Sequence, residues 1–236
     1  EFDESAAIRG GVPIIFPQFA GLGALPKHGF ARQQAWQILA QGQTHEAAAS
    51  AELGLQTSVE TLALWPEAFQ LKIRFEAKGQ TLAITLSVRN AGDTDLHYTA
   101  ALHSYLRVDE LVATSLEGLE RVSYHDSLRA GPLSAENEFE HEGALSFGPE
   151  IDRIYRTPGP LLLRDGERAL RIVSEGFTDT VVWNPGVDKA AALRDLGEGE
   201  WRFFVCIEAA VVSTPIRLAP GERWQGVQRL ALQSKR

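Results

Sequence analysis

Two short segments near the start of the chain combine cationic side chains with glycine. The first is Arg9-Gly10-Gly11-Val12-Pro13, and the second runs from Lys27 and His28 through Gly29 to Arg32. Glycine lets a ligand approach the backbone closely, and the guanidinium fork donates paired hydrogen bonds to phosphate oxygens. The two segments therefore predict an anion-binding site. The alternative is that these are solvated charges on loops.

His103 lies in an expected strand over residues 99–108. Strand alternation places Leu102 and Ser104 on one face and His103 with Tyr105 and Arg107 on the other. The second face is polar and aromatic, as a sugar-binding surface would be. The alternative is a histidine held by a hydrogen bond on a half-buried sheet.

Glu208 gives the strongest signal, because it is a carboxylate inside an apolar run. We expect a strand over residues 201–212, in which the apolar residues Val205 to Ile207 precede Glu208 and Ala209 to Val212 follow it. A buried carboxylate costs free energy unless it is paired or used in chemistry. Burial also tends to raise its pKa, as in many catalytic bases. Glu208 is therefore the predicted base, and Cys206 on the same face is expected only to pack.

Other candidates give weaker signals. Asp152 could bind sugar hydroxyls, pair with Arg153 or cap a turn, and Trp183 could stack on a pyranose or pack in the core. No paired cysteines, His-Glu-x-x-His sequence or aspartate-rich loop is present, so no metal is expected. No role is assigned to the remaining histidines outside the two motifs, which are His45, His97, His125 and His141.

The elements that must hold these residues are mostly strands. Alternating segments at 71–75 and 82–88 flank Lys78-Gly79-Gln80, and those at 161–163 and 170–173 flank Asp165-Gly166. Both patterns predict hairpins, and residues 180–183 and 227–232 are further expected strands. Helices are expected only at 59–64, capped by Ser58 and stopped at Trp65-Pro66, and at 188–196. The chain is therefore predicted to be all-β, as a large antiparallel β-sandwich.

Composition excludes several classes of protein. The formal net charge is −8 with no stripe of lysine and arginine, which argues against nucleic-acid binding. No segment approaches the roughly 18 apolar residues of a membrane span. The single cysteine, Cys206, excludes an internal disulfide and favours a reducing compartment.

In order along the chain, the motifs resemble the aldose 1-epimerase superfamily, and within it the hexose-6-phosphate mutarotase branch. The resemblance extends over nearly the whole chain and rests on the segments 8–13, 25–32, 64–69, 101–105, 152–155, 182–185, 205–208 and 218–222. It implies a galactose-mutarotase-like supersandwich with a concave sugar-binding cleft, no cofactor and a cytoplasmic location. We expect one monomeric mutarotase domain over residues 1–236 that lacks its first N-terminal strands.

The resemblance also implies roles for individual residues. Glu208 matches the family's base and His103 its general acid, while Arg9 and Arg32 match positions that hold the substrate phosphate. Lys27 occupies a position that lines the same pocket. His28 and Asp152 match positions that contact the sugar, and Trp183 belongs to a further matching segment.

The expected activity is interconversion of the α and β anomers of an aldohexose 6-phosphate, a small-molecule sugar phosphate. Glu208 would take the proton of the anomeric hydroxyl, and His103, with an imidazole pKa near its ordinary value, would protonate the ring oxygen. Three alternatives stay open: a 1-epimerase of free hexoses, a non-catalytic carbohydrate-binding sandwich, and a glycosidase using Asp152 and Glu208 as carboxylates roughly 5 to 10 Å apart.

Overall fold

Two antiparallel sheets carry the fold in the computed structural model, which describes residues 8–44, 48–129, 133–134 and 137–233. The first sheet has eight strands in the spatial order β1 (Ile14–Ile15), β6 (Leu96–Leu102), β16 (Phe204–Leu218), β15 (Asp179–Asn184), β12 (Ile151–Tyr155), β9 (Ser123–Asp126) and β10 (Glu138–Glu140), with β7 (Tyr105–Arg107) also paired to β16.

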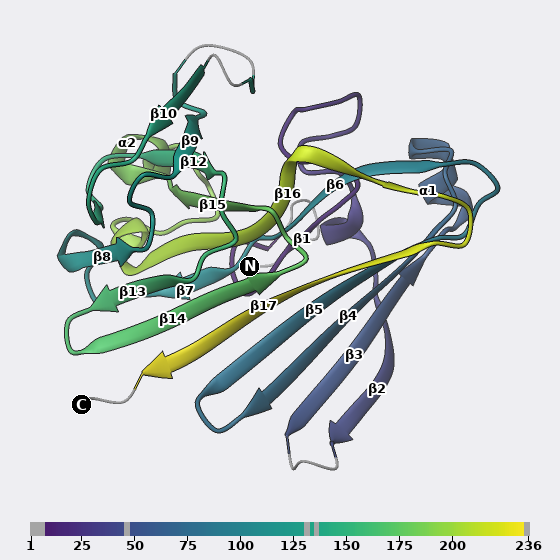
Figure 1. The fold of residues 1–236 in the computed structure, drawn as a ribbon, viewed down its shortest axis with the longest axis horizontal. Coiled ribbons are helices and arrows are strands. Elements are labelled where there is room, and N and C mark those ends of the chain that lie inside the picture. Colours follow the sequence, from purple (N-terminus) through teal and green to yellow (C-terminus); the bar gives the residue numbers. More distant parts are fainter. Residues whose placement is uncertain (1–7, 45–47, 130–132, 135–136, 234–236) are drawn as a thin grey trace.

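The second sheet has nine strands and forms the broad fan in the lower half of Figure 1. Its spatial order is β11 (Leu145–Ser146), β8 (Thr114–Glu117), β13 (Leu161–Asp165), β14 (Arg168–Glu175), β17 (Arg223–Gln233), β5 (Thr81–Asn90), β4 (Phe69–Lys78), β3 (Ala49–Gln56) and β2 (Gln37–Gln43). The predicted antiparallel all-β sandwich is confirmed.

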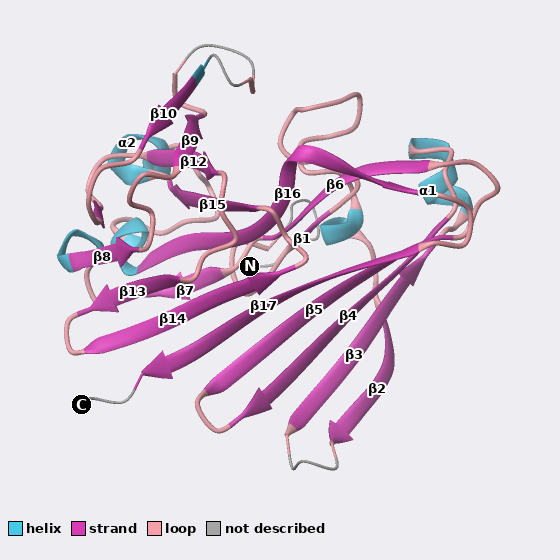
Figure 2. Cartoon of the chain, in the orientation of Figure 1, coloured by secondary structure: helices cyan, strands magenta, loops and turns pink. Residues whose placement is uncertain are grey.

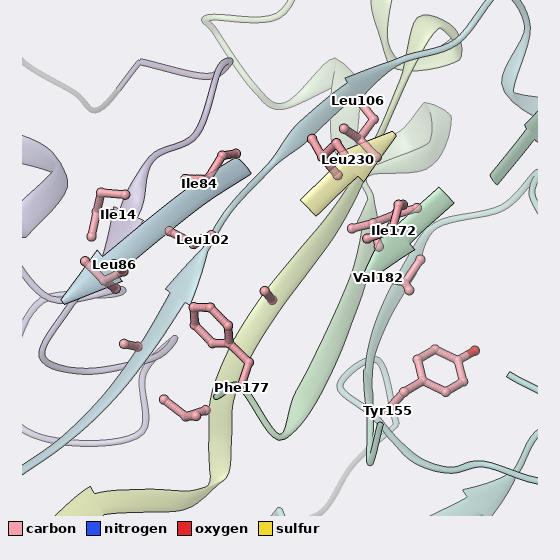
Figure 3. Packing of buried hydrophobic residues seen from close by; sticks show 14 of the residues in the cluster. Ile14, Ile84, Leu86, Leu102, Leu106, Tyr155, Ile172, Phe177, Val182 and Leu230 are labelled. Atoms are coloured by element: carbon pink, nitrogen blue, oxygen red, sulfur yellow. The ribbon is translucent and has the colours of Figure 1, made fainter. Parts of the chain in front are cut away.

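The main core lies between the two sheets and takes side chains from both (Figure 3). Leu102 and Val182 from the first sheet share this cluster with Ile84, Ile172 and Leu230 from the second. Because side chains alternate along a strand, the neighbours of these residues in the first sheet point to its opposite face. A smaller cluster there includes Ile154, Val181 and Ala210, covered by Phe19. The first sheet is thus packed on both faces.

Helices are short and lie at the ends of strands (Figure 2). The predicted helix at 59–64 is confirmed as α1 (Val59–Leu64), with Ser58 and Thr61 forming a capping box. Among the described residues, 3-10 turns form at η1 (Ala31–Gln33), η2 (Leu111–Ala113) and η4 (Glu200–Phe203). In the part of the chain that is described, no helix has the length and apolar character required to cross a bilayer.

Both predicted hairpins are confirmed. Gly79 joins β4 to β5 and Gly166 joins β13 to β14, with φ of 57° and 58°. These left-handed values favour glycine because it has no Cβ to clash. The remaining expected strands, at 180–183 and 227–232, lie within β15 and β17.

Three predicted boundaries were wrong. The helix expected at 188–196 is α2 (Gly186–Ala191), after which the amide of Ala192 bonds to the Lys189 and Ala190 carbonyls and Asp195 pairs with Arg9 instead of continuing a helix. The strand expected from residue 201 begins at Phe204, because Glu200–Phe203 forms η4.

The third wrong boundary is the strand expected over 99–108, which is broken into β6 and β7. The Ser104 amide turns back to the Leu102 carbonyl. The buried Ser104 hydroxyl donates to Gln228 Oε1 of the second sheet at 2.5 Å, and Gln228 Nε2 donates to the Ile207 carbonyl. The strand is thus interrupted at His103 and Ser104, where Ser104 contacts the second sheet.

Candidate active site

Strand register brings Glu208 and His103 together. β16 pairs Ala209 with Leu102 of β6, and Cys206 with Tyr105 of β7. The two pairs are three residues apart on both sides, so the register does not shift between them. Glu208 therefore lies opposite His103, and directly opposed residues of an antiparallel pair point to the same face. That face is the one turned away from the second sheet.

The pair is almost sealed from solvent. His103 is 8% exposed and Glu208 1%, and His103 Nε2 lies 3.4 Å from Glu208 Oε1. Within the described residues, Glu208 Oε2 and His103 Nδ1 are buried without a hydrogen-bond partner. Buried polar atoms normally have partners, so unpaired ones need an explanation. A ligand that brings its own hydroxyl groups would supply the missing partners.

Burial moves the two pKa values in opposite directions. It raises the pKa of Glu208 well above its ordinary value, and the nearby charge of Asp152 raises it further. Burial, followed by the charges of Arg32, Arg9 and Lys27, lowers the pKa of His103 to about 3. The expectation of an imidazole with an ordinary pKa was therefore wrong. At neutral pH the site holds a neutral imidazole beside a carboxyl that resists ionisation.

A second row of side chains crosses the same face beside the pair. The register aligns Asp152 with Trp183, Trp183 with Cys206 and Cys206 with Tyr105. Burial raises the pKa of Asp152, and Arg153 is paired with Asp126 instead of with Asp152. The Trp183 ring lies beside His103 in the site, with 5.8 Å between the two ring centroids, and Trp183 is 9% exposed. Cys206 is fully buried, as expected for a packing residue.

The segment from Lys27 to Arg32 reaches the pair through an unusual turn. His28 and Gly29 both have positive φ, 69° and 67°, and a Cβ on Gly29 would lie 2.2 Å from the Phe16 carbonyl oxygen. Only glycine fits there. Phe30 and Ala31 are buried behind the turn and anchor it. The His28 ring consequently lies 5.9 Å from that of His103.

His28 is held in one tautomer. The Ala20 amide donates to His28 Nδ1 at 3.3 Å, so the neutral ring carries its proton on Nε2. Burial, then the charges of Arg32, His103 and Lys27, lower the pKa of His28 to about 3. At neutral pH His28 is a neutral hydrogen-bond donor, a suitable group for a sugar hydroxyl.

Arg32 follows this turn at the wall of a hollow. Its Nη2 donates to the Lys27 carbonyl at 3.0 Å, while its Nε is buried without a partner among the described residues. Arg32, Gly10 and Trp36 are among the residues that line the hollow, which has a volume of about 300 Å³. Lys27 itself is exposed, and its charge lowers the pKa of Glu208, as that of Arg32 does.

Arg9 approaches the pair from a third segment. The amides of His103 and Tyr105 donate to the carbonyls of Pro13 and Gly11, which lays the Arg9-Gly10-Gly11 segment alongside them. Arg9 Nε donates to Asp195 at 2.8 Å, and its guanidinium lies 6.0 Å from the centre of the Trp183 ring. The predicted residues therefore gather at one place from six parts of the chain.

Sequence reasoning missed two residues at this site. Tyr105 was placed on the face of His103 but given no role, although alternation already indicated the contact. Asp195 carries no signal in the sequence, because it lies in the turn after α2 and meets Arg9 only through the fold. Across the described ranges, no group of three or more His, Cys, Asp or Glu side chains is arranged to hold a metal ion.

Comparison with solved structures shows the structural class to which this fold belongs. The crystal structure of the "putative mutarotase (YeaD)" from Salmonella typhimurium aligns with 100% of this chain and 78% of its own, with a TM-score of 0.86 and 27% identity. The protein Slr1438 of Synechocystis sp. PCC 6803 shares the fold at a TM-score of 0.78 and 21% identity, covering 98% of this chain and 81% of its own. The architecture is that of the mutarotase-like sandwiches.

The family follows from sequence comparison. The family model described as aldose 1-epimerase matches residues 2–231, and the chain belongs to that family. Two relatives carry the name "Putative glucose-6-phosphate 1-epimerase". The one from Cenchrus ciliaris is 37% identical over 98% of this chain and 71% of its own length. The one from Escherichia coli strain K12 is 32% identical over 90% of this chain and 70% of its own.

Proposed function

We propose that this chain interconverts the α and β anomers of an aldohexose 6-phosphate, with glucose 6-phosphate as the first substrate to test. The observation that carries the proposal is the buried Glu208–His103 pair, in which each member has a buried polar atom without a hydrogen-bond partner among the described residues. The names of the relatives from Cenchrus ciliaris and Escherichia coli support the phosphorylated substrate.

Anomer exchange requires two proton transfers. Glu208, when ionised, takes the proton of the anomeric hydroxyl while His103 gives a proton to the ring oxygen, and the bond between C1 and the ring oxygen breaks. The aldehyde rotates about the C1–C2 bond. Ring closure returns the proton of the C5 hydroxyl to His103 and moves a proton from Glu208 to the new anomeric oxygen. Each positioned proton transfer is commonly worth about two to four orders of magnitude in rate.

The substrate's phosphate would assist the protonation of His103. The charges of Arg32, Arg9 and Lys27 lower the pKa of this imidazole, after the larger effect of burial. A bound phosphate dianion offsets those cations, and so raises the pKa of His103 and favours the imidazolium that can act as an acid. We therefore assign Arg9, Arg32 and Lys27 to the phosphate, with His28, Asp152 and Trp183 around the sugar.

Exchange spectroscopy by NMR tests the proposal. The rate of exchange between the anomers of glucose 6-phosphate is measured with and without the protein, and the spontaneous rate is subtracted. Glucose is measured in parallel under the same conditions. We expect faster catalysed exchange for glucose 6-phosphate. Equal rates for both sugars would make the protein a 1-epimerase of free hexoses, and no acceleration of either would leave a carbohydrate-binding sandwich.

We further propose that the protein acts as a monomer in the cytoplasm. A reducing compartment suits a chain with one cysteine, which is buried as a free thiol. Sedimentation at micromolar concentration with and without glucose 6-phosphate would test the monomer, and a dimer in either condition would contradict it.

A further inference from the structure

Gln228 is a buried polar side chain in the core between the two sheets. It lies on β17, two residues before Leu230, and side chains two apart on a strand point to the same side. Leu230 belongs to the main core (Figure 3), and Gln228 is 0% exposed. Burying an amide costs free energy unless both its donor and its acceptor are bonded. A glutamine in this core therefore needs partners for both ends of its amide.

Both partners of Gln228 lie next to the Glu208–His103 pair. Its Nε2 donates to the carbonyl of Ile207 at 3.0 Å, and its Oε1 accepts from the hydroxyl of Ser104 at 2.5 Å. A carbonyl can only accept, so the amide has one possible orientation. Ser104 directly follows His103, and Ile207 directly precedes Glu208. One side chain of the second sheet thus bonds to a neighbour of each member of the pair.

Regular strand pairing is interrupted at this place. Residues 103 and 104 belong to neither β6 nor β7, and the His103 amide donates to the Pro13 carbonyl instead of to β16. Across the break, the amide of Ile207 donates to the Ser104 carbonyl at 3.2 Å. The amide of Gln228 adds a second connection between the same two residues. It therefore ties the broken strand to β16 where the ladder is weakest.

The polar ends of the pair receive no such support. In many catalytic sites a third group bonds to the other ring nitrogen of the histidine and sets its orientation. Within the described residues, His103 Nδ1 and Glu208 Oε2 have no hydrogen-bond partner. The distance between the two side chains therefore depends on how their backbones are held and on packing.

We propose that Gln228 is a positioning residue that sets the spacing between His103 and Glu208. It does so from behind the first sheet, through its bonds to Ser104 and Ile207. The reacting side chains project from the opposite face of that sheet, so Gln228 does not touch them. The inference rests on the proposed function, in which the pair performs both proton transfers. It assigns Gln228 to the rate of the chemical step and not to phosphate binding.

Gln228→Met tests the role of the amide. Methionine has a similar length and keeps the core filled, but it can bond to neither Ser104 nor Ile207. Asn90→Leu is the matched control. Asn90 is also a buried amide of the second sheet that donates to a carbonyl of β16, but at Leu218, the last residue of that strand. Both substitutions remove a bond between the sheets, and only Gln228→Met does so beside the pair.

Steady-state rates by NMR exchange are measured for glucose 6-phosphate and glucose. For Gln228→Met we expect kcat to fall roughly ten- to a hundredfold with both sugars, because a small misplacement of a catalytic group costs about this much. KM should change little, and Asn90→Leu should keep the wild-type kcat. Both variants should melt at a lower temperature, since each leaves buried backbone groups without partners. A fall in kcat as large in Asn90→Leu as in Gln228→Met would overturn the inference.

Ser104→Ala is a smaller change that keeps the test open if Gln228→Met does not fold, as judged by circular dichroism. It removes one of the two bonds, so kcat should fall roughly three- to tenfold. Where Gln228→Met folds, adding Ser104→Ala to it should lower kcat no further, because the two side chains act through the same bond. An unchanged kcat in Ser104→Ala, or losses that multiply in the double variant, would contradict the inference.

The NMR signals of the histidine rings distinguish failure of this inference from failure of the proposed function, because they need no turnover. Those of His103 should shift in Gln228→Met and stay in place in Asn90→Leu. The reference is His125, which is buried on β9, two strands away from β16. Its signals should stay in place in both variants. Equal shifts of both histidines would show a general change in structure and would overturn the inference.

The two proposals can then fail separately. If the wild type exchanges either sugar, an unchanged kcat in Gln228→Met refutes the positioning role. If the wild type exchanges neither sugar, the proposed function is refuted. In that case a shift confined to His103 still supports the positioning role, and unshifted His103 signals refute it too.

Discussion

His103 Nε2 lies 3.4 Å from Glu208 Oε1, in a register that sets the two residues directly opposite each other on neighbouring strands. The contact does not make these residues a conventional ion pair. Burial disfavours the charge on both members, lowering the pKa of His103 and raising that of Glu208. Ionised Glu208 and protonated His103 are therefore both unfavourable in this buried site.

Glu208→Gln should remove catalysis while keeping the fold. The amide is similar in shape but cannot accept the anomeric proton, so the exchange rate of glucose 6-phosphate should fall by at least about two orders of magnitude. NMR exchange measures the rate and circular dichroism checks the fold. A variant that is folded and exchanges at nearly the wild-type rate would refute the assignment of the base.

The same substitution should also stabilise the protein at neutral pH. A carboxyl whose pKa is raised on folding contributes stability below its ordinary pKa and loses it as the pH rises through the folded value. Glu208→Gln does not titrate and has no such loss. Its melting temperature should therefore exceed that of the wild type by more at pH 8 than at pH 4. A difference that does not depend on pH would show that Glu208 ionises freely in the folded protein.

Asp152→Asn and Arg32→Ala should shift the acid limb of the pH–rate profile in opposite directions. The charge of Asp152 raises the pKa of Glu208 and that of Arg32 lowers it. The base must be ionised, so kcat/KM falls as the pH drops through this pKa. Asp152→Asn should therefore move the fall to lower pH and Arg32→Ala to higher pH. Shifts in the same direction would contradict the electrostatic account.

Arg32→Ala should also discriminate between the two sugars. Its loss removes a guanidinium whose buried Nε has no hydrogen-bond partner in the described part of the chain. We therefore expect KM for glucose 6-phosphate to rise roughly ten- to a hundredfold and KM for glucose to change little. Arg202→Ala is the control, because Arg202 is a surface residue paired with Glu110. If both sugars lose affinity equally, Arg32 does not bind the phosphate.

Gly29→Ala should destabilise the turn that carries His28 and Arg32. Its Cβ would lie 2.2 Å from the Phe16 carbonyl oxygen, whereas a Cβ on Gly166, with similar positive φ, would meet nothing within 4 Å. Gly29→Ala and Gly166→Ala each lower the free energy of unfolding by about 1 to 2 kcal/mol through backbone strain. Only Gly29→Ala adds a steric clash, which lowers it by about another 1 to 3 kcal/mol. Urea unfolding of both variants measures the difference. Equal losses would show that the turn relaxes at little cost.

Local pattern was sufficient to predict much of the fold. Both hairpins, the capped helix α1 and the antiparallel sandwich follow from alternation, turn glycines and a Ser58 cap, which act over a few residues. The errors at α2 and at the strand break over His103 and Ser104 have distant causes. Asp195 pairs with Arg9, and Ser104 bonds to Gln228 of the other sheet. No local pattern encodes those contacts.

The sequence by itself determined which residue types were available for chemistry, because a carboxylate within an apolar strand and cations beside glycines are visible without a structure. Only the tertiary structure decided that Glu208 faces His103, that the Tyr105 ring stacks on the His103 ring, and that the imidazole is neutral. The physical reason is that pairing register and burial arise from segments far apart in the chain. Register fixes which side chains meet, and burial together with the gathered cations fixes their pKa values.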